Sequence, residues 1–114
     1  MIITRDLVLA ALARHVGKEN GVHVHELVYE VTGGIGRTPA RERLVREIVS
    51  ALREEGSHIC AHPSKGYFMA ANEQELDRYY IAFLRSRALH SLTLISRAKK
   101  IALPELLGQL RLNT

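Results

Sequence analysis

Residues 37–71 constrain the fold of this 114-residue chain more than any other part of its sequence. Thr38-Pro39 is a strong helix start, because a hydroxyl caps the first free amides and proline suits the first helical position. Apolar residues then recur at three-to-four spacing, which predicts a buried stripe on a helix from Thr38 to about Glu55: Val45, Ile48, Val49 and Leu52. Gly56 ends this helix. Two strands are predicted next, Ser57–His62 and Tyr67–Ala71, joined by the tight turn His62-Pro63-Ser64-Lys65-Gly66.

Two shorter helices are predicted before this stretch. The first has Thr4 as its N-cap and stops at Gly17. The second begins at Val24 or His25 and ends at Thr32-Gly33, with an apolar face made of Leu27, Val28 and Val31. Two short helices followed by a basic third helix give the order of a helix-turn-helix.

The segments between these helices also carry expectations. Asn20-Gly21 is a turn signal, and Val22-His23-Val24 after it is predicted to form a third strand beside the hairpin. The loop from Gly33 to Arg37 is rich in glycine, and we expect Ile35 within it to be anchored in the core.

Charge is distributed unevenly along the chain. The formal net charge is +4 and the sequence pI is about 9.6, a moderate bias toward anionic partners. Between Arg37 and Arg46 there are four arginines against one acid, Glu42. Between Asp77 and Glu105 there is no acid at all. This second basic stretch has two interpretations. It is either the solvated side of a helix that forms a dimer, or a contact to DNA in addition to the basic helix described next.

The basic third helix and the lysine-tipped hairpin together predict a surface for double-stranded DNA. The major groove admits a helix, and arginine bonds guanine bidentately. The alternatives are a solvated helix face, whose glutamates form i,i+4 pairs with the arginines, or a protein-binding surface. The candidate DNA-binding residues are Arg37, Thr38, Arg41, Arg43, Arg46, Ser50, His62, Ser64 and Lys65.

The sequence LREEGSHICAHPSKGYFMA, from Leu52 to Ala70, resembles the N-terminal winged-helix domain of biotin repressors and related transcriptional regulators. The matching elements are Leu52-Arg53, Gly56, Ile59, Pro63, Lys65-Gly66-Tyr67 and Ala70. The resemblance implies an α+β, mostly α fold: a winged helix-turn-helix (three helices plus a β-wing) over residues 1–71. It places Arg43, Arg46 and Glu47 on the groove-facing side of the third helix and Lys65 at the wing tip.

The loop before the third helix departs from this family. The family joins its second and third helices by a tight turn, whereas Gly33 to Thr38 is longer here. Contacts from Arg37, Thr38 and Arg41 are therefore less secure than those from Arg43 and Arg46. No biotin-ligase catalytic domain follows, so the resemblance implies no enzymatic role.

A long helix is predicted over residues 72–103. Asn72 and Glu75 form an N-cap and capping-box pair, and neither glycine nor proline interrupts the chain before Pro104. Its first turns are expected to pack on the preceding domain through Leu76, Tyr80 and Phe83. A second stripe with alternating three-and-four spacing predicts a seam for another helix, and hence a homodimer. The predicted dimerisation residues are Ile81, Leu84, Ala88, Ser91, Ile95 and Ala98, with Ala102 continuing the pattern.

Residues 104–114 are predicted to be a C-terminal tail. Gln109-Leu110-Arg111-Leu112 is similar to the peptide by which bacterial DNA-replication proteins engage the sliding clamp, although Asn113 stands where that peptide has phenylalanine. The partner-peptide residues are then Gln109, Leu110 and Leu112. This similarity suggests an alternative function, a replication accessory or adaptor protein, and together with the basic winged helix it is typical of phage or prophage proteins.

Several other functions are not favoured by the sequence. The sequence contains no Ser/His/Asp or Cys/His arrangement with supporting motif residues, no paired carboxylates and no phosphate-binding glycine loop. We therefore expect neither an enzyme nor a cofactor. His58, Cys60 and His62 alternate on one predicted strand, with His23 and His25 nearby, but their spacing is not that of a zinc finger. We expect Ile59 and Ala61 to face the core instead, with the histidines on the surface of the hairpin. A single cysteine fits a reducing cytoplasm. The longest apolar run, Leu7 to Ala13, is too short to span a membrane.

Overall fold

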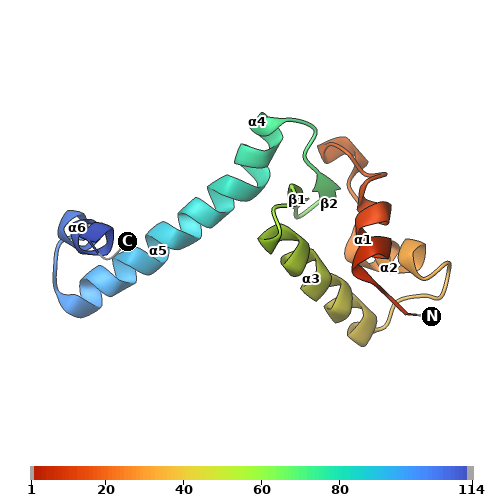
Figure 1. Cartoon of the computed structure of the whole chain (residues 1–114), viewed down its shortest axis with the longest axis horizontal. Helices are drawn as coiled ribbons and strands as arrows, with labels where there is room; N and C mark the ends of the chain where they lie inside the picture. The colour runs from red at the N-terminus through yellow and green to blue at the C-terminus, as the bar shows by residue number, and fades with distance from the viewer. Residues whose placement is uncertain (1, 113–114) are drawn as a thin grey trace. The chain divides into compact units, whose positions relative to one another are not determined.

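The protein is α+β and mostly helical, and it divides into two units after Tyr80. The computed structural model describes the backbone of residues 2–112 and the side chains of residues 2–110. In the first unit three α-helices precede a β-hairpin and a short helical segment (Figure 1). The elements are α1 (Arg5–Leu12), a 3-10 turn η1 (Lys18–Asn20), α2 (Val24–Val31), α3 (Pro39–Glu54), β1 (Ile59–His62), β2 (Gly66–Met69), α4 (Glu73–Leu76) and a π-turn η2 (Asp77–Ile81).

The helices of the first unit begin where the sequence predicts their caps. The Thr4 hydroxyl accepts a hydrogen bond from the Leu7 amide at 3.2 Å, and the Thr38 hydroxyl accepts one from the Arg41 amide at 3.1 Å. Pro39 occupies the first turn of α3. Each cap satisfies an amide that the helix cannot, which typically stabilises the fold by about 1 kcal/mol.

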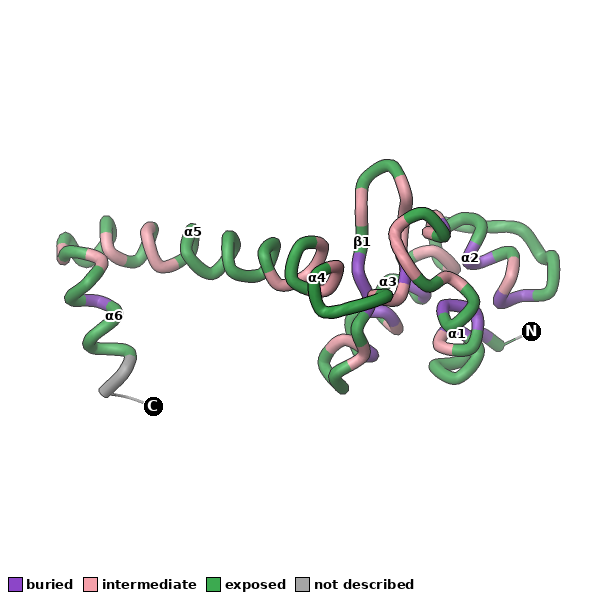
Figure 2. Tube along the Cα trace, turned by 90° about the horizontal axis from the view of Figure 1, so that it is seen from above, coloured by how far each residue is buried: buried purple, intermediate pink, exposed green. Residues whose placement is uncertain are grey.

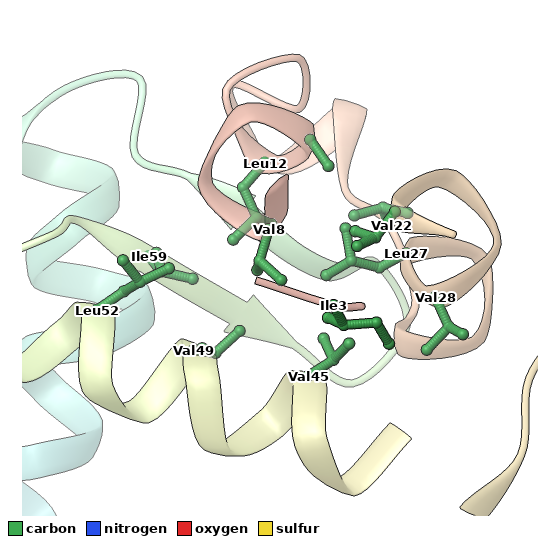
Figure 3. Packing of buried hydrophobic residues seen from close by; sticks show 12 residues of the cluster. Ile3, Val8, Leu12, Val22, Leu27, Val28, Val45, Val49, Leu52 and Ile59 are labelled. Atoms are coloured by element: carbon green, nitrogen blue, oxygen red, sulfur yellow. The ribbon is translucent and has the colours of Figure 1, made fainter. Parts of the chain in front are cut away.

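A single apolar core holds α1, α2 and α3 together. Figure 3 shows side chains from all three helices and from β1 converging on it. The predicted stripe of α3 is confirmed, with three residues fully buried and Ile48 packed at the margin. The predicted face of α2 is also confirmed. The fully buried residues include Val8, Leu12, Leu27, Val28, Val45, Val49, Leu52 and Ile59.

The hairpin is antiparallel, and the chain after α1 lies along its outer edge. Ile59 pairs with Met69 and His62 with Gly66. Val22 and Tyr67 exchange two backbone hydrogen bonds of 2.8 Å, so Val22 forms an isolated bridge. The predicted strand Val22-His23-Val24 was therefore wrong. His23 is already the N-cap of α2, which ends any strand after one residue.

Two further expectations about the core were wrong. Ile35 is 45% exposed, because Gly33 and Gly34 adopt positive φ and turn the loop outward, where the Ile35 amide donates to the Thr32 hydroxyl. In β1 the buried pair is Ile59 and Cys60, whereas Ala61 is exposed. The two neighbours point to opposite faces of the strand, and both faces are covered. Ile59 meets the helical core, and the Cys60 thiol approaches the Glu75 carbonyl at 3.7 Å.

The segment after the hairpin is fastened to it by polar and aromatic contacts. The Asn72 side chain accepts from the Glu75 amide at 2.9 Å, as predicted, but the Glu75 carboxylate accepts from the amides of Ala71 (2.9 Å) and Lys18 (3.1 Å). Tyr79 packs edge-on against Phe68, with ring centroids 5.6 Å apart. The π-turn therefore begins from a well-anchored position at the hairpin.

Arg53 joins three elements of the first unit. Its guanidinium lies 4.6 Å from the ring centre of Tyr80 and 5.9 Å from that of Tyr67, and its Nε donates to the Ile59 carbonyl at 2.9 Å. This arginine therefore has a structural role, linking the end of α3 to both strands and to the π-turn.

The second unit consists of two helices, α5 (Ala82–Lys99) and α6 (Leu103–Leu112). The helix predicted over residues 72–103 is helical from Glu73 to Lys99, through α4, η2 and α5, but it ends before residue 103, and the residues after it form α6 and not a tail. A proline ring clashes with the carbonyl four residues earlier, and for Pro104 that residue is Lys100. There the chain leaves the helix in the left-handed region, with φ 58°, and a new helix starts in which Pro104 occupies the first turn.

Burial in the second unit is sparse. Figure 2 shows exposed residues along most of α5, and none of the residues in Ala82–Lys99 is fully buried. Leu106 of α6 is buried, at 2% exposure. Phe83 is 56% exposed, in contrast to its predicted packing role. None of the helices over the described residues has the length and apolar character to cross a membrane.

Candidate nucleic-acid interface

The outer face of α3 presents polar and charged side chains opposite the buried stripe. Arg43, Arg46, Glu47 and Ser50 are all exposed, at helical spacing on the side away from Val45 and Val49. The packing of α3 against α1 and α2 determines this orientation, because the apolar stripe must face the core. The four side chains therefore stand on a rigid element.

The helix dipole does not account for the arginines of α3. Arg41 is the third residue of the helix, in the first turn, where a cation near the positive end of the dipole typically costs a few tenths of a kcal/mol of helix stability. Arg43 and Arg46 are the fifth and the eighth of its 16 residues, beyond that turn, where the dipole neither favours nor disfavours them. The dipole therefore gives no reason for the placement of these three arginines on α3.

Two carboxylates lie among these positive charges. Glu42 lies 3.8 Å from the guanidinium of Arg37 and 3.7 Å from that of Arg46. Both arginine side chains remain more than half exposed, so each pair stabilises the fold by about 1 kcal/mol at most. Glu47 is exposed on the same face as Arg43, and among the described residues neither of the two has an ion pair or a side-chain hydrogen bond. Four arginines against two carboxylates over residues 37–47 leave this surface a positive excess.

Two residues at the start of α3 make hydrogen bonds that stabilise the fold. The Thr38 oxygen caps the helix, and Arg41 Nη1 donates to the Gly36 carbonyl at 3.0 Å, closing the loop before α3. Arg37 is exposed beside them. These contacts do not test Arg37, Thr38 and Arg41 as DNA-binding residues, which remain a prediction.

The hairpin tip is organised by a small hydrogen-bond network. His62 Nδ1 accepts from the Ser64 amide at 3.2 Å and lies 3.0 Å from its hydroxyl. A ring nitrogen that accepts from an amide carries no proton, so in this arrangement the proton of His62 resides on Nε2. His23 Nε2 lies 3.2 Å from the Ser64 carbonyl and donates to it.

Lys65 at the tip has an acidic partner that the sequence did not reveal. Its Nζ lies 3.1 Å from Glu19 Oε2, and both side chains are substantially exposed. The hydrogen bond and charge of Lys65 lower the pKa of the Glu19 carboxyl. The two residues are 46 positions apart, so neither motif nor spacing could have indicated the pair.

The two groups of candidate residues remain separate in the first unit. Within the part of the chain that the structure describes, neither a hydrogen bond nor an ion pair joins the α3 side chains to His62, Ser64 or Lys65. Each group is held by its own local contacts, α3 by the core and the hairpin tip by the loop after α1.

The histidines and the cysteine do not form a metal centre in the described residues, where no group of three or more His, Cys, Asp or Glu side chains could hold an ion. His23 and His25 are at the start of α2, with stacked rings 6.0 Å apart, and not on a strand. Cys60 is buried beneath α4, and this burial raises the pKa of its thiol to about 11. The thiol is therefore protonated at neutral pH and unsuited to metal binding or nucleophilic chemistry.

The predicted dimerisation residues line one side of α5 and remain open to solvent. Leu84 is 44% and Ile95 41% exposed, Ile81 is half-buried, and Ala88, Ser91 and Ala98 are exposed. Of the predicted partner peptide, Gln109 and Leu110 are exposed on α6. Leu112 ends that helix and its side chain lies outside the described residues, as does Asn113.

Comparison of the chain with protein-family models, with curated proteins and with solved structures gave no significant match. Its fold and surface chemistry are therefore the basis for any proposal about its function.

Proposed function

We propose that this protein is a homodimeric, sequence-specific duplex DNA-binding protein of the winged helix-turn-helix class, acting as a transcriptional regulator. The observation that carries the proposal is the exposed outer face of α3, where arginines outnumber carboxylates and Arg43 has no ion pair among the described residues. In this proposal α3 enters the major groove and Arg43 and Arg46 contact base edges and phosphates.

The order and packing of the helices and strands support the proposed winged helix-turn-helix class. Three helices share one core, the third is the basic one, and a two-stranded hairpin follows it directly. The bridge between Val22 and Tyr67 adds a third backbone segment beside the hairpin. In a winged helix the hairpin is the wing, and its tip, with Lys65 and Ser64, would contact the DNA backbone.

Selection from random duplexes tests this function. We expect the full chain to enrich a palindrome of two half-sites, because a two-fold dimer presents two copies of α3 to the duplex. The spacing between the half-sites would report the dimer geometry. The absence of any enriched sequence in salt low enough to allow binding would contradict sequence-specific recognition.

The dimer is proposed to form through the seam on α5. An 18-residue helix without a fully buried residue gains little stability from its own chain, and an apolar side is stabilised by packing against another helix. Leu84 and Ile95 are the large exposed members of the seam.

Replacing the large seam residues tests the dimer. We expect Leu84→Ser with Ile95→Ser to weaken self-association at least 100-fold, since four apolar side chains per dimer each lose about 1 kcal/mol of burial. Light scattering coupled to size exclusion measures the change as a halved mass. The control is Leu89→Ser, which removes an exposed leucine from the side of α5 away from the seam. A monomeric wild type, or equal masses for both variants, would contradict the seam.

A further inference from the structure

A second side of α5 carries a regular line of basic and apolar side chains. Its members follow one another at spacings of four, three, four and three residues, so they share one side of the helix. We name this set the basic stripe: Phe83, Arg87, His90, Leu94 and Arg97. All five are exposed, and Phe83 and Leu94 are at least half exposed.

The basic stripe is distinct from the other two sides of the helix. Each of its residues directly precedes a seam residue, as Phe83 precedes Leu84 and Leu94 precedes Ile95, so it is rotated by about 100° from the seam. The side toward α6 is marked by partial burial, at Leu92, Thr93 and Ser96. In the heptad of the seam, Phe83, His90 and Arg97 are c positions outside the dimer contact, and Arg87 and Leu94 are g positions at its rim. A dimer through the seam therefore leaves the charged ends of the basic stripe in solvent.

The charges of the basic stripe have no compensation within the helix. The sequence contains no acid between Asp77 and Glu105, and in the described residues no carboxylate pairs with Arg87 or Arg97. Arg97 lies in the last turn of α5, where a cation interacts favourably with the helix dipole. Arg87 lies further from either end of the helix, so the dipole does not stabilise a cation there. The Arg87 guanidinium is 5.5 Å from the ring centre of Phe83, a contact that orients it without using its N–H donors.

We infer that the basic stripe binds the phosphate backbone of duplex DNA, as a sequence-independent contact outside the bases read by α3. The inference rests on the proposed function. Arg87 and Arg97 are about 15 Å apart along the helix, and each guanidinium has the planar donors that suit phosphate. Duplex DNA is a polyanion that could neutralise both the outer face of α3 and the basic stripe. An acidic helix of ordinary length that bound α5 would neutralise the basic stripe alone.

The salt dependence of binding tests the inference. We expect Arg87→Gln with Arg97→Gln to reduce the slope of log K against log salt by about 3.6 for the dimer, since each of its four phosphate contacts contributes about 0.9. At 0.15 M salt this corresponds to roughly a 30-fold loss of affinity for each protomer bound, or about 1,000-fold for the dimer, equal for the selected duplex and for a random one. Glutamine has nearly the helix propensity of arginine and remains polar, so circular dichroism and dimer mass are expected to remain unchanged.

Two control variants separate the position of the charges from their number. Arg5→Gln with Arg14→Gln removes two positive charges from the region of α1, and we expect it to keep the wild-type slope. Arg87→Lys with Arg97→Lys keeps the charge, and it is expected to retain most of the slope.

The outcomes distinguish this inference from the proposed function. If the wild type binds no duplex at low salt, the proposed function fails. If the wild type binds and the Arg87→Gln, Arg97→Gln variant shows the same slope, the inference about the basic stripe fails while the function stands. The inference about the basic stripe would also be overturned if the Arg87→Gln, Arg97→Gln variant kept the wild-type slope with DNA but was no longer retained on immobilised polyglutamate. That result would favour an acidic protein as the partner of the basic stripe.

Discussion

Replacing Arg43 and Arg46 together by alanine is expected to weaken binding to the selected duplex by about 100-fold or more. A bidentate arginine–guanine contact contributes about 1–3 kcal/mol, and two such contacts account for this loss. The preference for the selected duplex over a random one is expected to fall as well, because base readout is lost together with charge. Fluorescence anisotropy with both duplexes measures the two effects.

The same substitutions are expected to leave the fold intact. Both side chains are exposed and alanine has the highest helix propensity, which offsets the loss of the exposed pair between Arg46 and Glu42. The free energy of unfolding should therefore stay within about 0.5 kcal/mol of that of the wild type. The matched control is Arg5→Ala with Arg14→Ala, which should keep specificity. Full affinity in the Arg43→Ala, Arg46→Ala protein would exclude α3 as the reading helix.

Replacing Gly66 by alanine is expected to destabilise the first unit by about 3 kcal/mol or more. Gly66 has φ +78°, a region that costs a residue with a Cβ about 1–2 kcal/mol. The added Cβ would also lie 2.3 Å from the Val22 carbonyl oxygen and 2.5 Å from its carbon, and both are backbone atoms that cannot rotate away. The hairpin and the loop after α1 would have to separate.

Urea unfolding measures this effect, and the chain supplies a matched control. A Cβ added at Gly36 would meet no atom within 4 Å, and the φ of Gly36 is not positive, so Gly36→Ala is expected to be neutral or to stabilise by up to about 1 kcal/mol. Equal stability of the Gly66→Ala and Gly36→Ala proteins would mean that the close contact between hairpin and loop is absent in solution.

Features encoded within a few residues were predictable from the sequence. The caps at Thr4, Thr38 and Asn72 each act on an amide three residues ahead, and the stripe of α3 follows from helical spacing. The order of three helices and a hairpin could therefore be obtained from local patterns alone. The assignment of this arrangement to the winged-helix class remains a prediction.

Features that depend on distant segments could not be predicted in the same way. The prediction that alternate residues of β1 are buried assumes that only one face of the strand is covered. This prediction was wrong at Cys60, because α4 covers the second face of the hairpin. The Lys65–Glu19 pair joins residues whose proximity depends on the loop after α1. The helix break at Lys100 is different, because its cause is local: Pro104 is plain in the sequence, and its steric effect reaches four residues back.

The ion pair at the hairpin tip has a consequence for how the protein would approach a polyanion. A phosphate that reached Lys65 would meet an ammonium group that already donates to Glu19 at 3.1 Å. The ammonium group has three donors and both side chains are substantially exposed, so this pair stabilises the tip by about 1 kcal/mol at most. In the proposed complex, the phosphate would share Lys65 with Glu19 or replace that carboxylate, and the net gain from the contact would be smaller by up to that amount.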